Sequence, residues 1–142
     1  MSIWFKSFNL DEINAVNANT MVEHCGIQIT EVRDDGLVGV MPVTAAVKQP
    51  FGIVHGGANC TLAETLGSMA AFMTCDPDKS NAVGLSITTN HTKSVSSGIV
   101  TGVAKPVKLG RNIQVWDIKT YNDDNELTSV TVFTVSIIPR QR

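Results

Sequence analysis

Hydrophobic residues near the start of the chain recur at the spacing of a helix face. Within Asn9–Asn17 they fall three positions apart and so lie on one side of a short predicted helix: Leu10, Ile13 and Val16. Asn9 is a preferred N-cap residue, and the acidic pair Asp11 and Glu12 suits the positive end of the helix dipole. This pattern predicts a first helix with its apolar side toward the core.

Alternation between apolar and polar residues predicts strands elsewhere. Gly26–Arg33 and Leu37–Met41 form a hairpin, because Asp34-Asp35-Gly36 between them favours a tight turn. Runs rich in Thr, Val and Ile predict four more strands. These are Val83–His91 with its odd-numbered residues on one face, a stretch beginning at Gly98–Ala104, Arg111–Tyr121, and Leu127–Ile138.

A long, almost uncharged helix is predicted between the two groups of strands. Ala58–Thr74 contains no proline, whereas Lys48–Gly57 before it is a loop by its Pro and Gly content. An apolar stripe at helical spacing runs along the helix: Leu62, Leu66, Met69, Ala70 and Met73. The predicted order along the chain is one helix, two strands, the long helix and four strands, which lacks β-α-β alternation. This order predicts an α+β fold, in which an antiparallel sheet wraps around one long central helix.

The composition limits the class of protein. With 142 residues, 43% hydrophobic and 17% charged, the chain suits a single domain over residues 1–142. The net charge is −2 with no basic run, so nucleic acid is not an expected partner. The longest stretch without charge, Gln49–Ala63, is too short for a membrane span. An odd number of cysteines and the lack of a signal-peptide pattern favour a reduced, cytoplasmic protein.

The last predicted strands carry apolar residues on both faces, including Val130, Val132, Phe133 and Val135. A single sheet around one helix would also leave its edge strands exposed. We therefore expect a second subunit to extend the sheet, which makes the protein at least a homodimer.

Glu64 interrupts the apolar pattern of the central helix. It is the only carboxylate between Lys48 and Asp76, and burial of a carboxylate is costly, which favours a functional role. Ser68 lies one turn along the same face, where its hydroxyl can orient a water molecule. Two simpler interpretations stay open. Glu64 can lie on a solvent-facing strip, and the small residues around it can serve close packing: Gly57, Cys60, Thr61, Gly67 and Ala71.

The segment Val54-His55-Gly56-Gly57 leads into this helix about two turns before Glu64. The first N–H groups of a helix have no internal partners and carry partial positive charge, which suits an oxyanion or a polarised carbonyl. Glycines there let a ligand approach the backbone. An ordinary glycine-containing helix entry is the alternative interpretation.

Other combinations of residues are less specific. Cys60 and His55 could form a nucleophile pair, but no third orienting group is evident, and an inert buried thiol is the better explanation. The histidines and cysteines lack zinc-ligand spacing, and no phosphate-binding glycine motif occurs. Basic residues on or between the late strands can bind phosphates or simply face solvent: Lys93, Lys105, Lys108 and Arg111.

Taken together, these motifs resemble the hotdog-fold acyl-CoA thioesterases, and within them the PaaI-like group that includes bacterial aroyl-CoA thioesterases. The likeness rests on Gln49-Pro50-Phe51-Gly52 and His55-Gly56-Gly57, followed by Leu62-Ala63-Glu64-Thr65 with Gly67-Ser68. It extends in order and spacing over nearly the whole chain: Met41-Pro42-Val43, Val83-Gly84-Leu85, Asn90-His91, Leu109-Gly110-Arg111 and Gln114-Val115-Trp116.

The resemblance implies a hotdog fold and a homodimer that commonly pairs into a dimer of dimers, a homotetramer. It also implies a hydrolase that cleaves aryl- or acyl-CoA thioesters, or thioesters of an acyl carrier protein. No metal or redox cofactor is expected, because coenzyme A is part of the substrate. The acyl group stays open among a precursor of menaquinone biosynthesis, hydroxybenzoyl, phenylacetyl and medium-chain fatty acyl groups.

The resemblance further implies roles for individual residues. Glu64 would be the catalytic carboxylate, as nucleophile or general base, and Gly56 would offer its backbone N–H to the thioester oxygen. Gln49 and His55 would hold the acyl carbonyl, and Ser68 would position the hydrolytic water. In this family the carboxylate faces loop residues of the other subunit, so the site would lie at the dimer interface. Substrate-binding roles would fall to Met69 in the acyl pocket, His91 near the acyl or pantetheine end, and Lys93 and Arg111 at the nucleotide phosphates.

Two other functions stay open from the sequence. A hotdog hydratase or dehydratase acting on acyl-CoA would use a His with an Asp, and no Asp occurs in the predicted central helix. A non-catalytic protein that binds CoA esters would need neither Glu64 nor Gln49. Both residues are present, and this favours the hydrolase.

Overall fold

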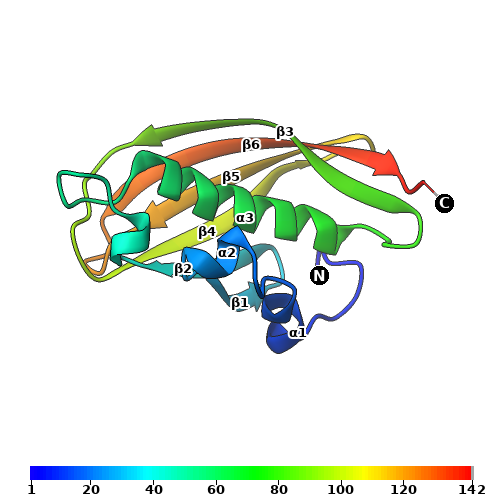
Figure 1. The fold of residues 1–142 in the computed structure, drawn as a ribbon. Helices are drawn as coiled ribbons and strands as arrows, with labels where there is room; N and C mark the ends of the chain where they lie inside the picture. The colour runs from blue at the N-terminus through cyan, green and yellow to red at the C-terminus, as the bar shows by residue number, and fades with distance from the viewer. Residues whose placement is uncertain (142) are drawn as a thin grey trace.

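The computed structural model describes residues 1–141, which form an antiparallel sheet crossed by one long helix (Figure 1). Its helices are α1 (Leu10–Ala15), α2 (Met21–His24) and α3 (Gly56–Thr74), with a 3-10 turn, η1, at Ala45–Val47. Its strands are β1 (Gln28–Arg33), β2 (Gly36–Pro42), β3 (Ser80–His91), β4 (Ile99–Leu109), β5 (Ile113–Tyr121) and β6 (Leu127–Pro139). None of the described helices combines the length and the apolar character needed to cross a membrane.

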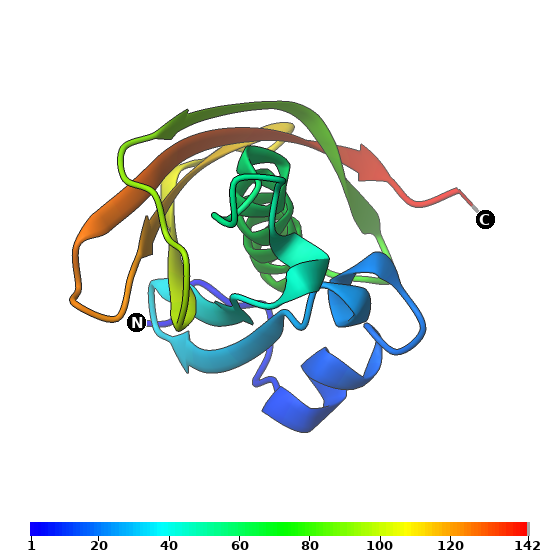
Figure 2. The ribbon, with the colours of Figure 1, turned by 60° about the vertical axis from the view of Figure 1, so that its left-hand side comes forward.

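The six strands pair antiparallel in the order β1-β2-β4-β5-β6-β3. The sheet curves around α3, which lies along its concave side (Figure 2). This arrangement confirms the predicted α+β fold, the hotdog fold, with one central helix wrapped by the sheet. The two edges of the sheet are β1 and β3, so β3 offers one side of its backbone to an added strand.

Glycines let α3 approach the sheet closely. Gly39 of β2 pairs with Gly102 of β4, and Leu66 of α3 fits over this pair. A Cβ atom at Gly39 or Gly102 would lie 2.7 or 2.6 Å from a Leu66 methyl group, so neither position has room for a side chain. Within α3, a Cβ at Gly67 would lie 2.5 Å from the Phe133 ring. Close packing, the simpler of the two interpretations, therefore explains Gly67.

The predicted alternation along Val83–His91 is wrong. The β3–β6 register shifts at Leu85, where β3 carries one residue more than its partner strand. Val83 and Leu85 are consequently exposed, at 46% and 59%, whereas Ile87 packs against the core. A single inserted residue reverses which face the following side chains take, and the period of two does not reveal it.

Several boundaries differ from the prediction for reasons of length or capping. The first helix is confirmed, with the Asn9 side chain accepting the Asp11 N–H, but it ends at Ala15. The helices α2 and η1 have four and three residues, too short to leave a periodic signal. The strand predicted over Gly98–Ala104 continues to Leu109, and its register with β5 shifts just after Pro106.

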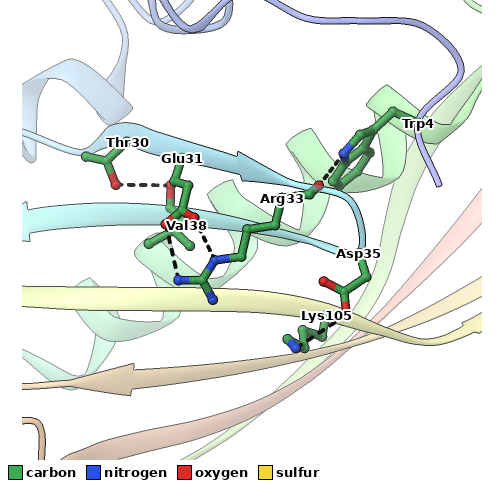
Figure 3. A network of polar contacts seen from close by, with 7 residues as sticks. All are labelled: Trp4, Thr30, Glu31, Arg33, Asp35, Val38 and Lys105. Carbon is green, nitrogen blue, oxygen red and sulfur yellow. Dashed lines mark hydrogen bonds and ion pairs between the residues drawn. The ribbon is translucent and has the colours of Figure 1, made fainter. Parts of the chain in front are cut away.

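The N-terminal segment is fastened across the β1–β2 hairpin and the end of α3. The Trp4 indole N–H donates to the Arg33 carbonyl at 2.6 Å, and the Trp4 ring stacks on Trp116 at 6.5 Å between centroids. Figure 3 shows this hydrogen bond beside the ion pairs of the hairpin. The Phe5 N–H then donates to the Met73 carbonyl at 2.9 Å. The segment before α1 therefore contacts first the β1–β2 hairpin and then the end of α3.

Candidate active site

A groove of about 950 Å³ lies between α3 and the N-terminal part of the chain. One wall is the strip of α3 that does not face the sheet, and the other is formed by α1, α2 and the segment before them. Figure 1 shows α1 and α2 on one side of α3. The lining is mainly apolar, with two carboxylates and one amine. The lining residues are Lys6, Phe8, Glu12, Ile13, Val16, Asn17, Met21, Val22, Thr61, Glu64, Thr65, Ser68, Met69 and Phe72.

Glu64 lies on the groove wall and is exposed in the single chain. The expectation of a carboxylate buried within the chain is therefore wrong, and the alternative of a solvent-facing strip is correct for one subunit. Its Oε1 lies only 3.2 Å from where a Cβ of Gly84 would stand, so Glu64 leans toward the edge strand β3. Ser68 lines the same groove one turn further along, as predicted from the spacing.

Met69 also lines the groove, although the sequence places it on the buried stripe of the helix. It is only partly buried, whereas Leu62, Leu66 and Met73 of the same stripe are fully buried. Its position agrees with the role in an acyl pocket that the resemblance implies. Phe72 is the next groove residue along α3 and is exposed.

The start of α3 exposes a backbone donor. His55 is the N-cap, and its Nδ1 accepts the Gly57 N–H at 2.8 Å. The helix begins at Gly56, two residues before the predicted start, so the Gly56 N–H is the first of the helix. No acceptor within residues 1–141 contacts that N–H. A free N–H at the start of a helix is able to donate to a carbonyl oxygen, the role that the resemblance implies for Gly56.

Two further predicted residues gather at this end of α3. Gln49 belongs to the loop before the helix, and its Oε1 accepts a close hydrogen bond from the Phe51 N–H. His91, the last residue of β3, lies against Gly56: its Nε2 is 2.9 Å from where a Gly56 Cβ would stand. His55, Gly56 and His91 thus lie together at one helix end, and Gln49 lies in the loop that leads to it; we call these four residues the helix-entry cluster.

One subunit does not bring the helix-entry cluster to Glu64. Glu64 follows Gly56 by eight residues in the same helix, which corresponds to ~12 Å along the axis at ~1.5 Å per residue. Catalytic groups must lie within hydrogen-bonding reach of the same reacting carbonyl. Within one chain the two groups are therefore about two turns of α3 apart.

Lys93 and Arg111 are not brought together either. Lys93 forms an ion pair of 2.8 Å with Glu126, which holds the pKa of Lys93 above its usual value through a hydrogen bond and its negative charge. Glu126 lies just before the start of β6, beside the end of β5, whereas Arg111 precedes the start of β5. Since the nine residues of β5 span ~30 Å, the two cations lie at opposite ends of the sheet.

Sequence reasoning missed the residues that the N-terminal part contributes to the groove. Among them, Asn17 has a buried side-chain Nδ2 without a hydrogen-bond partner in the described chain. The apolar face of the first helix could have indicated this groove. It was assigned to the core, but Val16 on that face is 66% exposed. Asn59 at the helix entry was also missed, because an amide within an apolar helix has no distinctive spacing. Cys60 is partly buried, and within the described chain no hydrogen bond joins its thiol to the His55 ring.

Known proteins share both the sequence and the fold. A model of the thioesterase superfamily matches residues 51–129, which is more than half of the chain. The proofreading thioesterase EntH of Cronobacter sakazakii is 42% identical over 136 residues, covering 96% of this chain and 98% of its own. The crystal structure of a thioesterase variant from Pseudomonas aeruginosa matches with a TM-score of 0.97 at 37% identity, covering 98% of this chain and 100% of that chain. A thioesterase from Haemophilus influenzae matches with a TM-score of 0.94 at 42% identity, covering 96% and 95%. The chain therefore belongs to the thioesterase superfamily, as a thioester hydrolase with the hotdog fold.

Proposed function

We propose that the protein hydrolyses aryl- and acyl-CoA thioesters, and thioesters of the same acyl groups on a carrier protein, with Glu64 as the catalytic carboxylate. The observation that carries this proposal is the groove, in which Glu64 and Ser68 stand beside an apolar lining open to an acyl group. The carboxylate and a helix end supply the activated oxygen and the polarised carbonyl that the reaction needs. We propose that it proceeds without a resident cofactor.

In the proposed reaction the Gly56 N–H donates to the thioester carbonyl oxygen. Glu64 then takes a proton from a water molecule that Ser68 holds, or attacks the carbonyl carbon itself to form an anhydride that water opens. Either route builds negative charge on the carbonyl oxygen, where the free N–H of the helix start is most effective. Collapse of the tetrahedral intermediate breaks the carbon–sulfur bond, and the thiolate leaves and takes up a proton. Gln49 and His55 support the carbonyl from the loop side.

The proposed acyl site is the apolar part of the groove. Phe8, Val16 and Met21 face Met69 and Phe72 across it, which suits an aromatic ring or a short branched chain. The proofreading activity named for the relative EntH supports a role on misloaded or dead-end thioesters. A menaquinone precursor and a hydroxybenzoyl group are the acyl groups that we propose for this site. CoA thioesters of this kind form in the cytoplasm, where we place the protein.

We propose that the working unit is a homodimer in which Glu64 of one subunit meets the helix-entry cluster of the other. The ~12 Å between Gly56 and Glu64 along α3 favours a site in which the Glu64 that acts beside a given Gly56 belongs to another subunit. The edge strand β3 favours this assembly: Val83 and Leu85 are exposed on it, and Glu64 leans toward it at Gly84. Lys93 and Arg111 would bind the phosphates of CoA, with the two cations contributed by different subunits of a dimer of dimers.

The test is thiol release from a panel of CoA thioesters, including benzoyl-CoA, by the wild type and Glu64→Gln. We expect the substitution to lower kcat by ~100-fold or more, because general acid–base groups contribute about 10²–10⁴-fold. Glu31→Gln is the matched control, since Glu31 is an exposed carboxylate on β1, paired with Arg33. It should retain full activity. Turnover by Glu64→Gln within a few-fold of the wild type would exclude Glu64 as the catalytic group.

A further inference from the structure

His91 lies over the backbone at the start of α3. A Cβ atom at Gly56 would lie 2.9 Å from its Nε2, 3.2 Å from its Cε1 and 3.5 Å from its Cδ2. The ring occupies the space that any side chain at position 56 would fill. Of its ring atoms, Nε2 lies nearest to where a Gly56 Cβ would stand, and the Gly56 N–H makes no hydrogen bond within the described chain.

Asn59 contacts the opposite nitrogen of the same ring. It belongs to the first turn of α3, is only 6% exposed, and places its side-chain Nδ2 3.3 Å from His91 Nδ1. With the amide nitrogen turned toward the ring, Asn59 donates and Nδ1 accepts. In a neutral imidazole the proton then resides on Nε2, which becomes a donor on the side of the ring that faces Gly56.

The other half of the Asn59 amide has no partner. Its Oδ1 is buried and makes no hydrogen bond within residues 1–141. A buried acceptor without a partner is unfavourable for folding, so Asn59 is a poor choice for stability alone. Its one side-chain hydrogen bond is the contact with His91, which points to a role exercised through that ring.

We propose that Asn59 is a positioning residue that holds His91 in the tautomer with the proton on Nε2. His91 then donates to an oxygen of the bound thioester, beside the donor of Gly56. This inference rests on the proposed function for its substrate, but the tautomer itself is a property of the resting protein. A second donor beside the helix start would strengthen the polarisation of the carbonyl group.

The first test is nuclear magnetic resonance of the protein labelled with ¹⁵N histidine, at a pH where the rings are neutral. Comparison with His91→Gln assigns the His91 signals among the three histidines. We expect a non-protonated Nδ1 and a protonated Nε2. Asn59→Asp keeps the size of the side chain but replaces the donor by an acceptor, so the proton should move to Nδ1. A wild-type ring protonated on Nδ1, or a tautomer that Asn59→Asp leaves unchanged, overturns the proposal.

The second test measures hydrolysis by the same variants. Asn59→Asp should lower kcat by ~10-fold or more, since loss of one donor to the developing oxyanion costs about 10²–10³-fold and positioning supplies part of it. Asn59→Ala, which removes the amide if Asn59→Asp folds poorly, should give a mixture of tautomers and a similar loss. Asn14→Asp is the control, because Asn14 is also a partly buried amide but bonds only to backbone groups of Leu10 and Ile29. It should leave the His91 signals unchanged and kcat within about twofold.

The outcomes separate this inference from the proposed function. If Asn59→Asp and Asn59→Ala lower only the stability of the protein and keep kcat within about twofold of the wild type, Asn59 has only a structural role. If Glu64→Gln stays active while Asn59→Asp shifts the tautomer and loses turnover, the assignment of Glu64 fails and that of Asn59 stands.

Discussion

Two inactive variants of this enzyme should restore activity when their subunits are mixed. Glu64→Gln removes the proposed carboxylate, and Gly56→Pro removes the proposed N–H donor. Proline is well tolerated at the first position of a helix, and it prefers the extended backbone that His55 already has, with φ −62° and ψ 134°. The proline Cβ would lie 2.9 Å from Nε2 at the far end of the His91 side chain, so we expect the backbone to keep its fold while the His91 ring is displaced. Loss of one oxyanion donor should reduce kcat by about 10²–10³-fold.

The expected recovery follows from the separation of the two groups along α3. If each site takes Gly56 from one subunit and Glu64 from the other, a mixed dimer contains one intact site and one doubly defective site. Random reassociation of equal amounts makes about half of the dimers mixed, so activity should return to about a quarter of the wild type. If both groups of a site came from one chain, every site would stay defective.

The assay is thiol release after the two variants are unfolded together in denaturant and refolded. Each variant refolded alone serves as the control for activity recovered by refolding itself. Circular dichroism before mixing checks that Gly56→Pro is folded. A refolded mixture no more active than the mean of the two separate variants would refute the shared site.

Three further outcomes are expected. Met69→Ala should widen the acyl site and raise kcat/KM for bulky aroyl-CoA relative to acetyl-CoA by ~10-fold, the scale of hydrophobic-pocket discrimination; an unchanged ratio places the acyl group elsewhere. Gly67→Val should lower the free energy of unfolding by ~2 kcal/mol in urea at fixed protein concentration, because its Cβ would lie 2.5 Å from Phe133; a loss below ~0.5 kcal/mol contradicts this. Lys93→Ala and Arg111→Ala should raise KM for CoA thioesters but not for N-acetylcysteamine thioesters, which lack phosphates; an equal effect on both substrates argues against phosphate binding.

The central helix and the sheet could be predicted because their signals are local. The helix has nineteen residues and a single charge, and the strands are rich in β-branched residues. These patterns arise because one or both faces of each element are buried, and they can be read within the element itself. The helix entry at His55 and Gly56 was likewise predictable, since N-capping and glycine chemistry act within a few residues. Only the exact start of α3 was misplaced, by two positions.

The features that were missed depend on contacts between distant segments. The bulge at Leu85 is defined by the partner strand β6, and the groove by α1 and α2 lying beside α3. Asn59 acquires its role only when the end of β3 places His91 next to it, 32 positions along the chain. The exposure of Glu64 in one subunit is likewise unreadable from its apolar neighbours. In each case the residue is visible in the sequence, but the neighbour that determines its environment comes from a distant segment and is not.

The central claim is that Glu64 of one subunit and Gly56 of another act on the same thioester carbonyl. A crystal structure with a ketone analogue of benzoyl-CoA, in which a methylene group replaces the sulfur, tests it most directly. We predict a carbonyl oxygen ~3 Å from the Gly56 nitrogen. We also predict a carboxylate oxygen of Glu64 from the partner subunit ~3–3.5 Å from the carbonyl carbon, or one water molecule away from it. A bound analogue whose carbonyl group contacts neither residue would contradict the claim.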